Sequence, residues 1–291
     1  MRRVSVVITA VALLSLAACG SSSKSSSGSA STTTPAKTRP HVTIEAFDYG
    51  FKLPAQMPAG WVDVTLHNTG KQGHQIAFAK LGATTLAAFK TAAGATDVKA
   101  LKNVQFVGGP NNAEPGASVT ATIHLEPGEY GVACFIPADD GKSHAAHGMV
   151  GKVNVVQTAD SVEEPPTVDG GSVSLSEFTF IPDASFTGTG TVEIKNVGTQ
   201  VHEMIIVKEA EGKTFDQVKG FFLTPPGSPP PAGPPPFTSA GGIVGLGPGQ
   251  TMYQQMALTP GTYVLVCFFP DPTKGDQPHA LEGMIKEITV S

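Results

Sequence analysis

Two stretches of the sequence each place a cysteine, a histidine and a methionine close together, in that order. These residues are Cys134, His144 and Met149 in the first stretch, and Cys267, His279 and Met284 in the second. In both, the Met follows a Gly and lies five positions after the His. A thiolate, an imidazole and a thioether, joined by one more imidazole, are the ligands of mononuclear copper electron-transfer sites. The residue types therefore indicate copper chemistry at two places in the chain.

The additional imidazole is found upstream in both halves of the chain. The pattern Asn-x-Gly-x-x-x-His occurs at residues 68–74 and again at 196–202, so it supplies His74 and His202. Each pattern follows a segment of alternating apolar and polar residues and precedes an apolar one, which favours a position between two strands. Each half of the chain thus offers two imidazoles, one thiolate and one thioether.

Short strands are the elements that must position these ligands. Residues 127–133 and 260–266 begin with Pro-Gly, which favours a turn, and continue with Tyr and aliphatic residues typical of a mostly buried strand. A Cys follows each of them. The two Cys are 133 positions apart, and two further Pro-Gly pairs share this offset, so both halves are built on one template. A short helix is expected in each half, at residues 84–93 and 214–222.

With these motifs the sequence resembles the plastocyanin and azurin family of blue copper proteins, the cupredoxins. The resemblance covers residues 42–155 and 173–290. It implies an all-β fold of two tandem Greek-key β-sandwiches, each with a short helix, and one type 1-like copper in each. The metal ligands that it implies are His74, Cys134, His144 and Met149 in the first half and His202, Cys267, His279 and Met284 in the second.

Two alternatives remain open for these ligands. His147 competes with His144, because His-Ala-Ala-His-Gly-Met offers two imidazoles; Glu282 takes the place of His147 in the second half, which favours His144. A disulfide between Cys134 and Cys267 is the other alternative, since exported thiols commonly pair.

Length and composition bound the fold class and the partners. A chain of 291 residues suggests two domains, expected at residues 41–157 and 172–291 with a linker at 158–171. With 33 Gly and 24 Pro, many of them between short strands, an all-β architecture is favoured over a helical one. The net charge of −5 and the lack of a basic patch make nucleic acid an unlikely partner. A proline-rich insertion at residues 225–236 is expected to be an extended loop or a docking surface.

The N-terminal segment predicts export and a lipid anchor. Residues 1–18 have the charged start and apolar core of a signal peptide. Residues 16–20 match the lipobox of bacterial lipoproteins, in which Cys19 is lipidated and becomes the first residue. Residues 19–40 then form a Ser- and Thr-rich flexible tether. We therefore expect a membrane-anchored protein on the extracytoplasmic face of the cell membrane.

Electron transfer is the leading functional hypothesis. A redox partner protein is expected, but no small-molecule substrate. Copper capture or delivery is an alternative, and a metal-free scaffold for adhesion or sensing is another, based on the long Cys-to-His segments of nine and eleven residues. An enzyme is not expected, because multicopper oxidases and copper nitrite reductases use His-x-His pairs, which this sequence lacks. The other histidines, His41, His67 and His124, have no counterparts in the repeat and are expected on strand faces or at the end of the tether.

Overall fold

Nineteen strands, two α-helices and two 3₁₀ helices make up the part of the chain that the computed structural model describes, residues 38–224 and 233–291. The first half contains β1 (His41–Phe47), β2 (Gly50–Lys52), β3 (Gln56–Pro58), β4 (Gly60–Asn68), β5 (Ala77–Lys80), α1 (Leu86–Ala95), η1 (Ala100–Asn103), β6 (Gln105–Gly108), β7 (Ser118–Leu125), β8 (Gly128–Ala133) and β9 (Val150–Val156). The second half contains β10 (Ser172–Ser176), β11 (Thr179–Pro182), β12 (Thr189–Asn196), β13 (His202–Glu209), α2 (Phe215–Phe222), β14 (Phe237–Leu246), β15 (Thr251–Ala257), β16 (Gly261–Val266), β17 (Pro270–Asp271), β18 (Gln277–Pro278), η2 (His279–Glu282) and β19 (Ile285–Val290).

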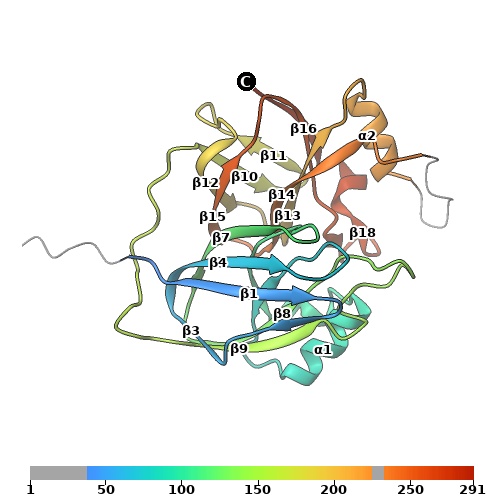
Figure 1. Ribbon diagram of the computed structural model, residues 1–291. Helices are drawn as coiled ribbons and strands as arrows, with labels where there is room; N and C mark the ends of the chain where they lie inside the picture. The colour runs from blue at the N-terminus through green and yellow to red at the C-terminus, as the bar shows by residue number, and fades with distance from the viewer. Residues whose placement is uncertain (1–37, 225–232) are drawn as a thin grey trace, which may run out of the picture. The chain divides into compact units, whose positions relative to one another are not determined.

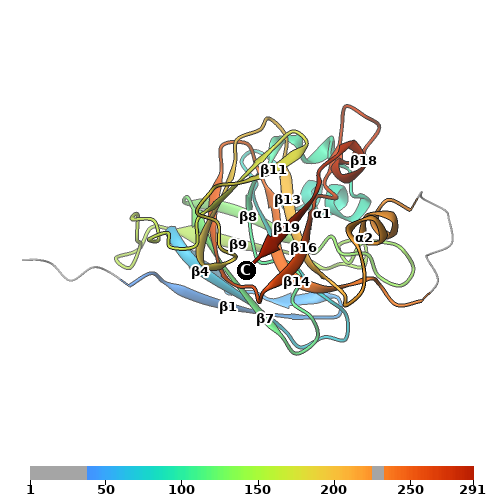
Figure 2. The ribbon, with the colours of Figure 1, turned by 90° about the horizontal axis from the view of Figure 1, so that it is seen from above.

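The strands form two large sheets and one small one. The first has the order β11-β10-β12-β15-β7-β4-β1-β2, the second has the order β19-β16-β13-β14-β6-β5-β8-β9-β3, and β17 pairs only with β18. Figure 1 shows β7, β4 and β1 side by side, and Figure 2 shows β16 next to β19 at the C-terminal end. The prediction of a mostly β protein is confirmed, while the Greek-key connectivity stays a prediction.

Alternating residues give the strands one buried and one more accessible face. In β4, the side chains of Val62, Val64 and Leu66 are fully buried, and the residues between them are partly exposed. These three residues belong to a core cluster that also contains both cysteines and the methionines that follow them. The period-two alternation therefore places the apolar side chains of β4 in the same core as the candidate Cys and Met ligands.

The two predicted helices are present and have side-chain caps at their N-termini. The Thr85 hydroxyl accepts the Ala88 N–H at the start of α1. At the start of α2, Thr214 and Gln217 form a reciprocal capping box. In both helices, the hydroxyl of the N-cap Thr accepts a hydrogen bond from a first-turn backbone N–H that has no partner within the helix.

Strands of the two halves pair with each other in both large sheets. In one, β7 pairs with β15 through Ile123 and Met252, and in the other, β6 pairs with β14 through Val107 and Leu246. The described residues of both halves, 38–224 and 233–291, belong to one compact unit. The domain boundaries at 41–157, 158–171 and 172–291 stay predictions. Two such domains would each contribute strands to both large sheets.

Several sequence predictions lie outside the described residues. These are the signal peptide, the lipidation of Cys19, the tether as far as residue 37, and residues 225–232 of the proline-rich insertion. No helix in residues 38–224 and 233–291 is long and apolar enough to cross a membrane.

Candidate metal centres

Three of the four predicted ligands of the first half converge on one buried point, which we call the first centre. His74, Cys134 and His144 each contribute one ligand atom to a group whose atoms all lie within 4.8 Å of one another. The Nδ1 atoms of the two histidines are 3.1 Å apart, and the Cys134 Sγ lies 3.4 Å from Nδ1 of His144. All three side chains are fully buried.

The second half repeats this geometry with His202, Cys267 and His279, the second centre. Here the two Nδ1 atoms are 3.0 Å apart, and the Cys267 Sγ lies 3.4 Å from Nδ1 of His279. The three side chains are again fully buried. Two centres built from the same residue types with nearly equal distances indicate one recurring ligand geometry.

The segment between Cys and His folds back on itself in both halves, which explains how a long segment still brings the two ligands together. In the first half, the His144 N–H donates to the Ile136 carbonyl at 2.9 Å, and Ala145 N–H donates to the Cys134 carbonyl at 2.8 Å. In the second half the additional residues form the β17–β18 hairpin, which begins at Pro270 and ends at Pro278. The extra length therefore forms a small excursion and does not separate the ligands.

The predicted methionine ligands lie beside their cysteines in the backbone network. The Cys134 N–H donates to the Met149 carbonyl at 3.2 Å, and the Cys267 N–H donates to the Met284 carbonyl at 3.1 Å. Both methionine side chains are fully buried in the same core cluster as the sulfur atoms of the cysteines. Their position next to the Cys is consistent with an axial thioether.

Acceptor groups fix the protonation of the ring nitrogens in the first centre. Nε2 of His74 lies 2.9 Å from a carboxylate oxygen of Asp48, and Nε2 of His144 lies 3.0 Å from Oε1 of Gln72. Because these oxygens only accept, each Nε2 carries the hydrogen and each Nδ1 carries a lone pair. The Gln72 amide is itself oriented by donating from Nε2 to the Tyr49 hydroxyl at 2.9 Å.

The second centre has the same outer contacts from different residues. Oε1 of Gln200 lies 3.2 Å from Nε2 of His279, and Oε1 of Glu177 lies 3.5 Å from Nε2 of His202. The Gln200 side chain also hydrogen-bonds to Asp271, which directs its amide nitrogen away from the histidine. Nε2 of His202 makes no hydrogen bond at this distance. In the first centre, where both Nε2 atoms are hydrogen-bonded, two lone pairs about 3 Å apart with no hydrogen between them form a site that a cation would satisfy.

Four residues of these outer contacts were not expected from the sequence: Asp48, Gln72, Glu177 and Gln200. A signal was present, because Gln occupies the same place in both Asn-x-Gly-x-x-x-His patterns, two positions before the His. An acidic residue followed by an aromatic one likewise occurs at 48–49 and 177–178. Neither repeat could be distinguished from ordinary loop residues before the contacts were known.

The outer carboxylates remain ionised. Burial opposes ionisation of Asp48, but hydrogen bonds from the Lys71 and Gln72 N–H groups and from His74 outweigh it and lower its pKa. For Glu177, burial is likewise outweighed by backbone N–H groups, chiefly those of Thr199 and Gln200, and its pKa falls to about 2. Each centre therefore has a fixed negative charge next to one of its imidazoles.

Burial keeps the free thiols protonated and the imidazoles of His144 and His279 neutral. It raises the pKa of Cys134 to about 12 and that of Cys267 well above its usual value. It also lowers the pKa of His144 and of His279 to about 4, with a further contribution from the neighbouring His. A metal must therefore displace the thiol proton, and backbone N–H groups already point at each sulfur, such as Gln75 N–H at 3.5 Å from the Cys134 Sγ.

The structure separates the two imidazoles that compete for the first centre. His144 belongs to the group with His74 and Cys134, whereas His147 stacks on Tyr49 and contacts Asp140 through Nε2 at 3.0 Å. Both cysteines are free thiols, contrary to the disulfide alternative. The other three histidines lie in strands β1, β4 and β7, as expected: His41, His67 and His124.

The chemistry of the donor set fits copper. Two imidazole nitrogens with free lone pairs, one thiol sulfur and a neighbouring buried Met are a mixed N and S set of the kind that copper electron-transfer sites use. The buried position excludes the carboxylate and water ligands that calcium or magnesium would need. The outer hydrogen bonds to both Nε2 atoms are the usual support of metal-bound histidines.

No protein-family model matches the chain, and no curated protein matches it. Among solved structures, it is similar to auracyanin from the photosynthetic bacterium Roseiflexus castenholzii, at 23% identity over 40% of this chain and 96% of that one, with a TM-score of 0.30. It is also similar to an azurin from Methylomonas sp. strain J, at 13% identity over 41% of this chain and 100% of that one, with a TM-score of 0.30. A multicopper oxidase is similar at 15% identity over 88% of this chain and 90% of that one, with a TM-score of 0.27. A further similar structure, auracyanin A from Chloroflexus aurantiacus, is described as a blue copper protein, at 20% identity over 40% of this chain and 99% of that one, with a TM-score of 0.28.

Proposed function

We propose that this chain binds one copper at each centre and transfers single electrons. One observation supports the proposal: the chain has two fully buried groups of His, Cys and His. Within each group, the three ligand atoms all lie within 4.8 Å of one another. The free lone pairs of both imidazoles in each group converge on one point. Because the donor atoms are already close together without a metal, the geometry of the site should change little when bound copper changes its oxidation state.

When bound by this donor set, copper supplies reversible one-electron chemistry. The chain's own residues keep the ligands in place. Asp48 and Gln72 hold the two rings of the first centre through Nε2. In the second centre Gln200 holds His279 through Nε2, and the Glu177 carboxylate lies 3.5 Å from Nε2 of His202. Backbone N–H groups directed at each sulfur stabilise a thiolate in a buried environment. Both effects limit rearrangement between the two oxidation states.

Copper titration of the soluble chain tests this proposal. We expect two equivalents to bind, with an intense visible thiolate-to-copper band and matching electron paramagnetic resonance signals. Cys134→Ser and Cys267→Ser should each remove half of the band intensity, because a serine oxygen is a poor ligand for the metal. His147→Ala is the matched control in the first half and should retain the band. Copper that binds without any such band would contradict thiolate ligation, and a chain that takes up no copper would instead favour the metal-free scaffold.

Repeated oxidation and reduction distinguish electron transfer from copper delivery. An electron carrier should retain its copper through many cycles, because the donors are preformed. A delivery protein should lose copper to a chelator after the first reduction. Electrochemistry of the loaded soluble chain, followed by metal analysis, gives the answer, and loss of copper in one redox state would replace our proposal with copper handling.

We also propose that the protein is not an enzyme of the oxygen- or nitrite-reducing type. Support comes from the donor count: within residues 38–224 and 233–291, the His, Cys, Asp and Glu groups able to hold a metal are the first and second centres. A catalytic copper with open positions would need further imidazoles. The loaded chain should therefore reduce neither oxygen nor nitrite at a rate above free copper, and turnover of either would overturn this part.

Lipid anchoring at Cys19 on the extracytoplasmic face remains part of the proposal, with support from the lipobox at residues 16–20 alone. The anchor would hold the two centres near a membrane, where a redox partner protein could reach them. Cys19→Ala should release the protein from the membrane or leave it unprocessed. Persistence of a lipid-modified, membrane-bound Cys19→Ala product would exclude Cys19 as the anchor.

A further inference from the structure

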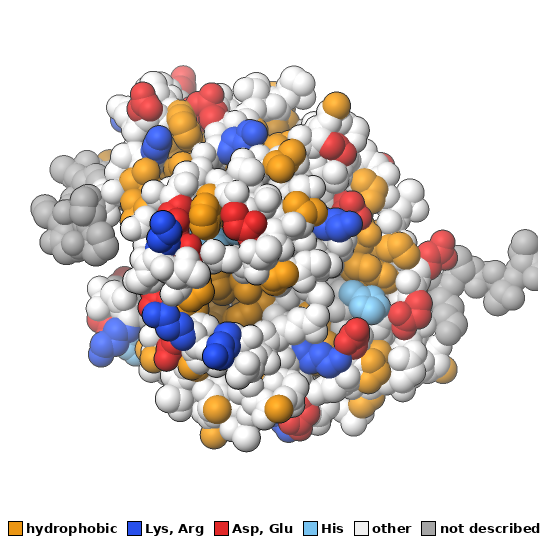
Figure 3. All heavy atoms as spheres, turned by 180° about the vertical axis from the view of Figure 1, so that it is seen from behind, with side chains coloured by type: hydrophobic (Ala, Val, Ile, Leu, Met, Phe, Trp, Pro, Cys, Tyr) orange, Lys and Arg blue, Asp and Glu red, His pale blue; other side chains and the backbone are white. Residues whose placement is uncertain are grey.

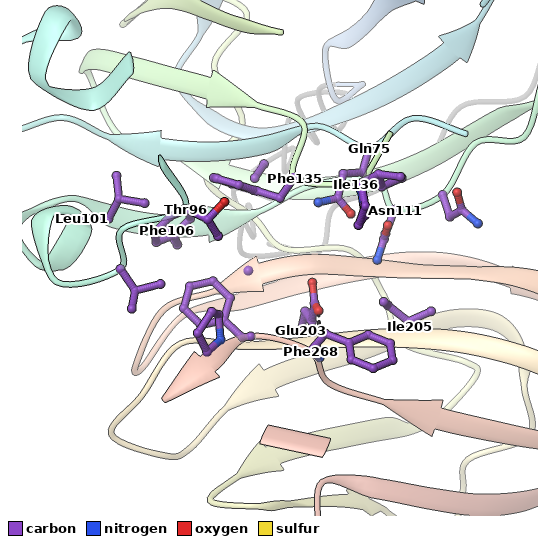
Figure 4. A pocket seen from close by; sticks show the side chains of 17 residues that line it. Gln75, Thr96, Leu101, Phe106, Asn111, Phe135, Ile136, Glu203, Ile205 and Phe268 are labelled. Atoms are coloured by element: carbon purple, nitrogen blue, oxygen red, sulfur yellow. Dashed lines mark hydrogen bonds between the residues drawn. The ribbon is translucent and has the colours of Figure 1, made fainter. Parts of the chain in front are cut away.

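A cavity of about 530 Å³ lies between the two halves of the chain. Its walls come from both of them, and Figure 4 shows Phe135 and Gln75 on one side and Glu203 and Phe268 on the other. The face of the molecule in Figure 3 is hollowed near its centre, with hydrophobic side chains in the hollow. Mostly apolar cavities of this size between structural units are the usual places for small ligands.

The cavity touches both centres through the residues that follow their ligands. Gln75 and Phe135 directly follow His74 and Cys134, while Glu203 and Phe268 directly follow His202 and Cys267, and all four line the cavity. His202 and Glu203 lie in β13, where successive side chains point to opposite faces, and the other three cavity residues lie in the segments that leave the ligand positions. A molecule in the cavity is therefore one backbone position from both metal centres.

Aromatic rings form a continuous part of the wall. The Phe106 ring lies 6.4 Å from that of Phe135 and 5.7 Å from that of Phe269. The Phe269 ring in turn lies 6.3 Å from the ring of His279, a ligand of the second centre. Such a wall fits a flat aromatic molecule, because rings pack favourably at centroid distances of about 4.5–7 Å.

One charged side chain is built into this apolar wall. Glu203 is buried at 9% exposure, and its Oε1 accepts the Phe268 N–H at 2.9 Å, which leaves Oε2 for a ligand. The amides of Gln75 and Asn111 lie on the opposite wall. The cavity thus combines an apolar slot with a carboxylate oxygen that can accept a hydrogen bond from a hydroxyl group.

We propose that this cavity binds a small aromatic hydroquinone, which donates electrons to both centres. The inference rests on the proposed function, because the centres must hold copper to accept electrons. It adds a substrate class that the sequence analysis did not expect. The apolar rings select the flat ring, the Glu203 carboxylate selects the hydroxyl, and two one-electron acceptors match a two-electron donor.

The reaction balances with the parts named. Both phenolic O–H bonds of the hydroquinone break, and their two protons leave to water. Two electrons leave the ring, and copper held by His74, Cys134 and His144 and by His202, Cys267 and His279 would supply one one-electron acceptor at each centre. The ring becomes a quinone, which has no hydroxyl to donate to Glu203 and should leave more readily.

Binding is tested first on the metal-free chain, so that it does not depend on copper. Tetramethylhydroquinone is the probe, and its dimethyl ether is the matched control, since it keeps the ring but lacks both O–H donors. By calorimetry we expect one hydroquinone per chain and at least tenfold weaker binding of the ether. Glu203→Gln should weaken hydroquinone binding severalfold and leave ether binding unchanged. No binding of the hydroquinone, or equal binding of both compounds, would overturn the proposal.

Ala77→Leu tests the location, because Ala77 lines the cavity and a larger side chain would fill part of it. We expect it to reduce hydroquinone binding at least tenfold. If this variant does not fold, as judged by circular dichroism, crystals of the wild-type chain soaked with the probe replace it. Density for the probe among Phe106, Phe135 and Phe268 supports the proposal, and density only elsewhere contradicts it.

Electron donation is tested on the copper-loaded chain, after a titration has shown that copper binds. One equivalent of tetramethylhydroquinone should bleach both visible bands and yield one quinone per two copper ions, whereas the ether should bleach neither. Binding without bleaching would overturn the donor assignment. Failure of the proposed function has a different signature, namely hydroquinone binding to a chain that takes up no copper.

Discussion

At the scale of single residues, each candidate ligand depends on a partner that orients it. The imidazoles have their Nε2 atoms held by carboxylate or amide oxygens, and the sulfur atoms accept backbone N–H groups. These outer contacts decide which nitrogen faces the metal. Substitutions beside the ligands should therefore change metal binding although they remove no ligand.

Asp48→Asn tests this dependence in the first centre. The amide keeps the size of the side chain but removes the charge that fixes the His74 proton on Nε2. Loss of such an outer partner typically costs about 10- to 100-fold in metal affinity, and we expect that loss in the first centre alone. Competition with a chelator measures it. Asp183→Asn, which changes an exposed carboxylate contacting Ser172 and Ser185, is the control, and an equal loss there would contradict the assignment.

The two centres differ in charge at one equivalent position, because Gln75 in the first half corresponds to Glu203 in the second. Burial raises the pKa of Glu203 to about 7, and its carboxylate in turn disfavours the thiolate of Cys267. A negative charge near copper stabilises the oxidised state. The second centre should therefore have the lower reduction potential, most clearly above pH 7, where Glu203 is ionised.

Reciprocal substitutions test the difference in potential. Glu203→Gln should raise the potential of the second centre on the order of 100 mV at pH 8.5, since a unit charge near the metal at an effective dielectric constant of ~20 is worth roughly 2–4 kcal/mol. Gln75→Glu should lower that of the first centre. Spectroelectrochemistry measures both. Below pH 6 the difference between wild type and Glu203→Gln should vanish, and an effect independent of pH would argue against the charge.

At the scale of structural elements, the segments between Cys and His determine whether these two ligands come together. Each returns to the cysteine through backbone hydrogen bonds, and the second one uses the β17–β18 hairpin to do so. Asp271, at the base of this hairpin, accepts the Thr273 N–H and also hydrogen-bonds to Gln200. Asp271 therefore stabilises the hairpin and also orients Gln200, which in turn orients the ligand His279.

Asp271→Asn should therefore act on the second centre through Gln200. The new amide can donate as well as accept, so the Gln200 amide loses its preference and can turn its nitrogen toward His279. We expect severalfold weaker copper binding there, with the first centre unchanged, as measured by titration of the Cys134→Ser and Cys267→Ser variants in parallel. An equal loss in both centres would indicate general destabilisation instead.

The sequence predicted the strands and the ligand types, because both follow from local patterns. The strand that ends at Cys134 and the helix α1 lie close to where alternation, turns and caps placed them. The contact of Gln72 with His144 could not be predicted, because it joins residues 72 positions apart through a loop of unusual length. The pairing of β7 with β15 was also missed, since edge strands do not show their partners in their own sequence.

At the scale of the whole molecule, acid should destabilise the metal-free chain. The folded-state pKa values of His144 and His279 are about 4, below the ordinary 6.5, so the unfolded chain takes up protons first. Their contribution is complete above pH 6.5 and is lost as the pH falls to 4. Glu177, at about 2, adds a further loss below pH 4.5. Urea unfolding at pH 7, 5.5 and 4 should show steadily lower free energies of unfolding, and a flat profile would contradict these shifts.

Separation of the halves between residues 157 and 171 tests the domain prediction. Each half carries its own centre and strands in both large sheets, so we expect each to fold when expressed alone. Separation exposes the edges of β7 and β15, so the two halves should reassociate when mixed, as seen by size-exclusion chromatography. Two halves that stay unfolded alone and fold only together would show a single shared domain.

The pairing of β7 with β15 also has a symmetry. Ala121 lies opposite Gln254 in an antiparallel register, and these residues are 133 positions apart, the same interval that separates the two cysteines. β7 and β15 are equivalent strands of the two halves, and they pair antiparallel around two equivalent residues. A local two-fold axis through that residue pair therefore relates the two strands. The junction within this chain is therefore isologous, like the interface of a homodimer. By the same symmetry, the β7 edge of the first half is complementary to itself, so two copies of the first half expressed alone should be able to pair as a homodimer.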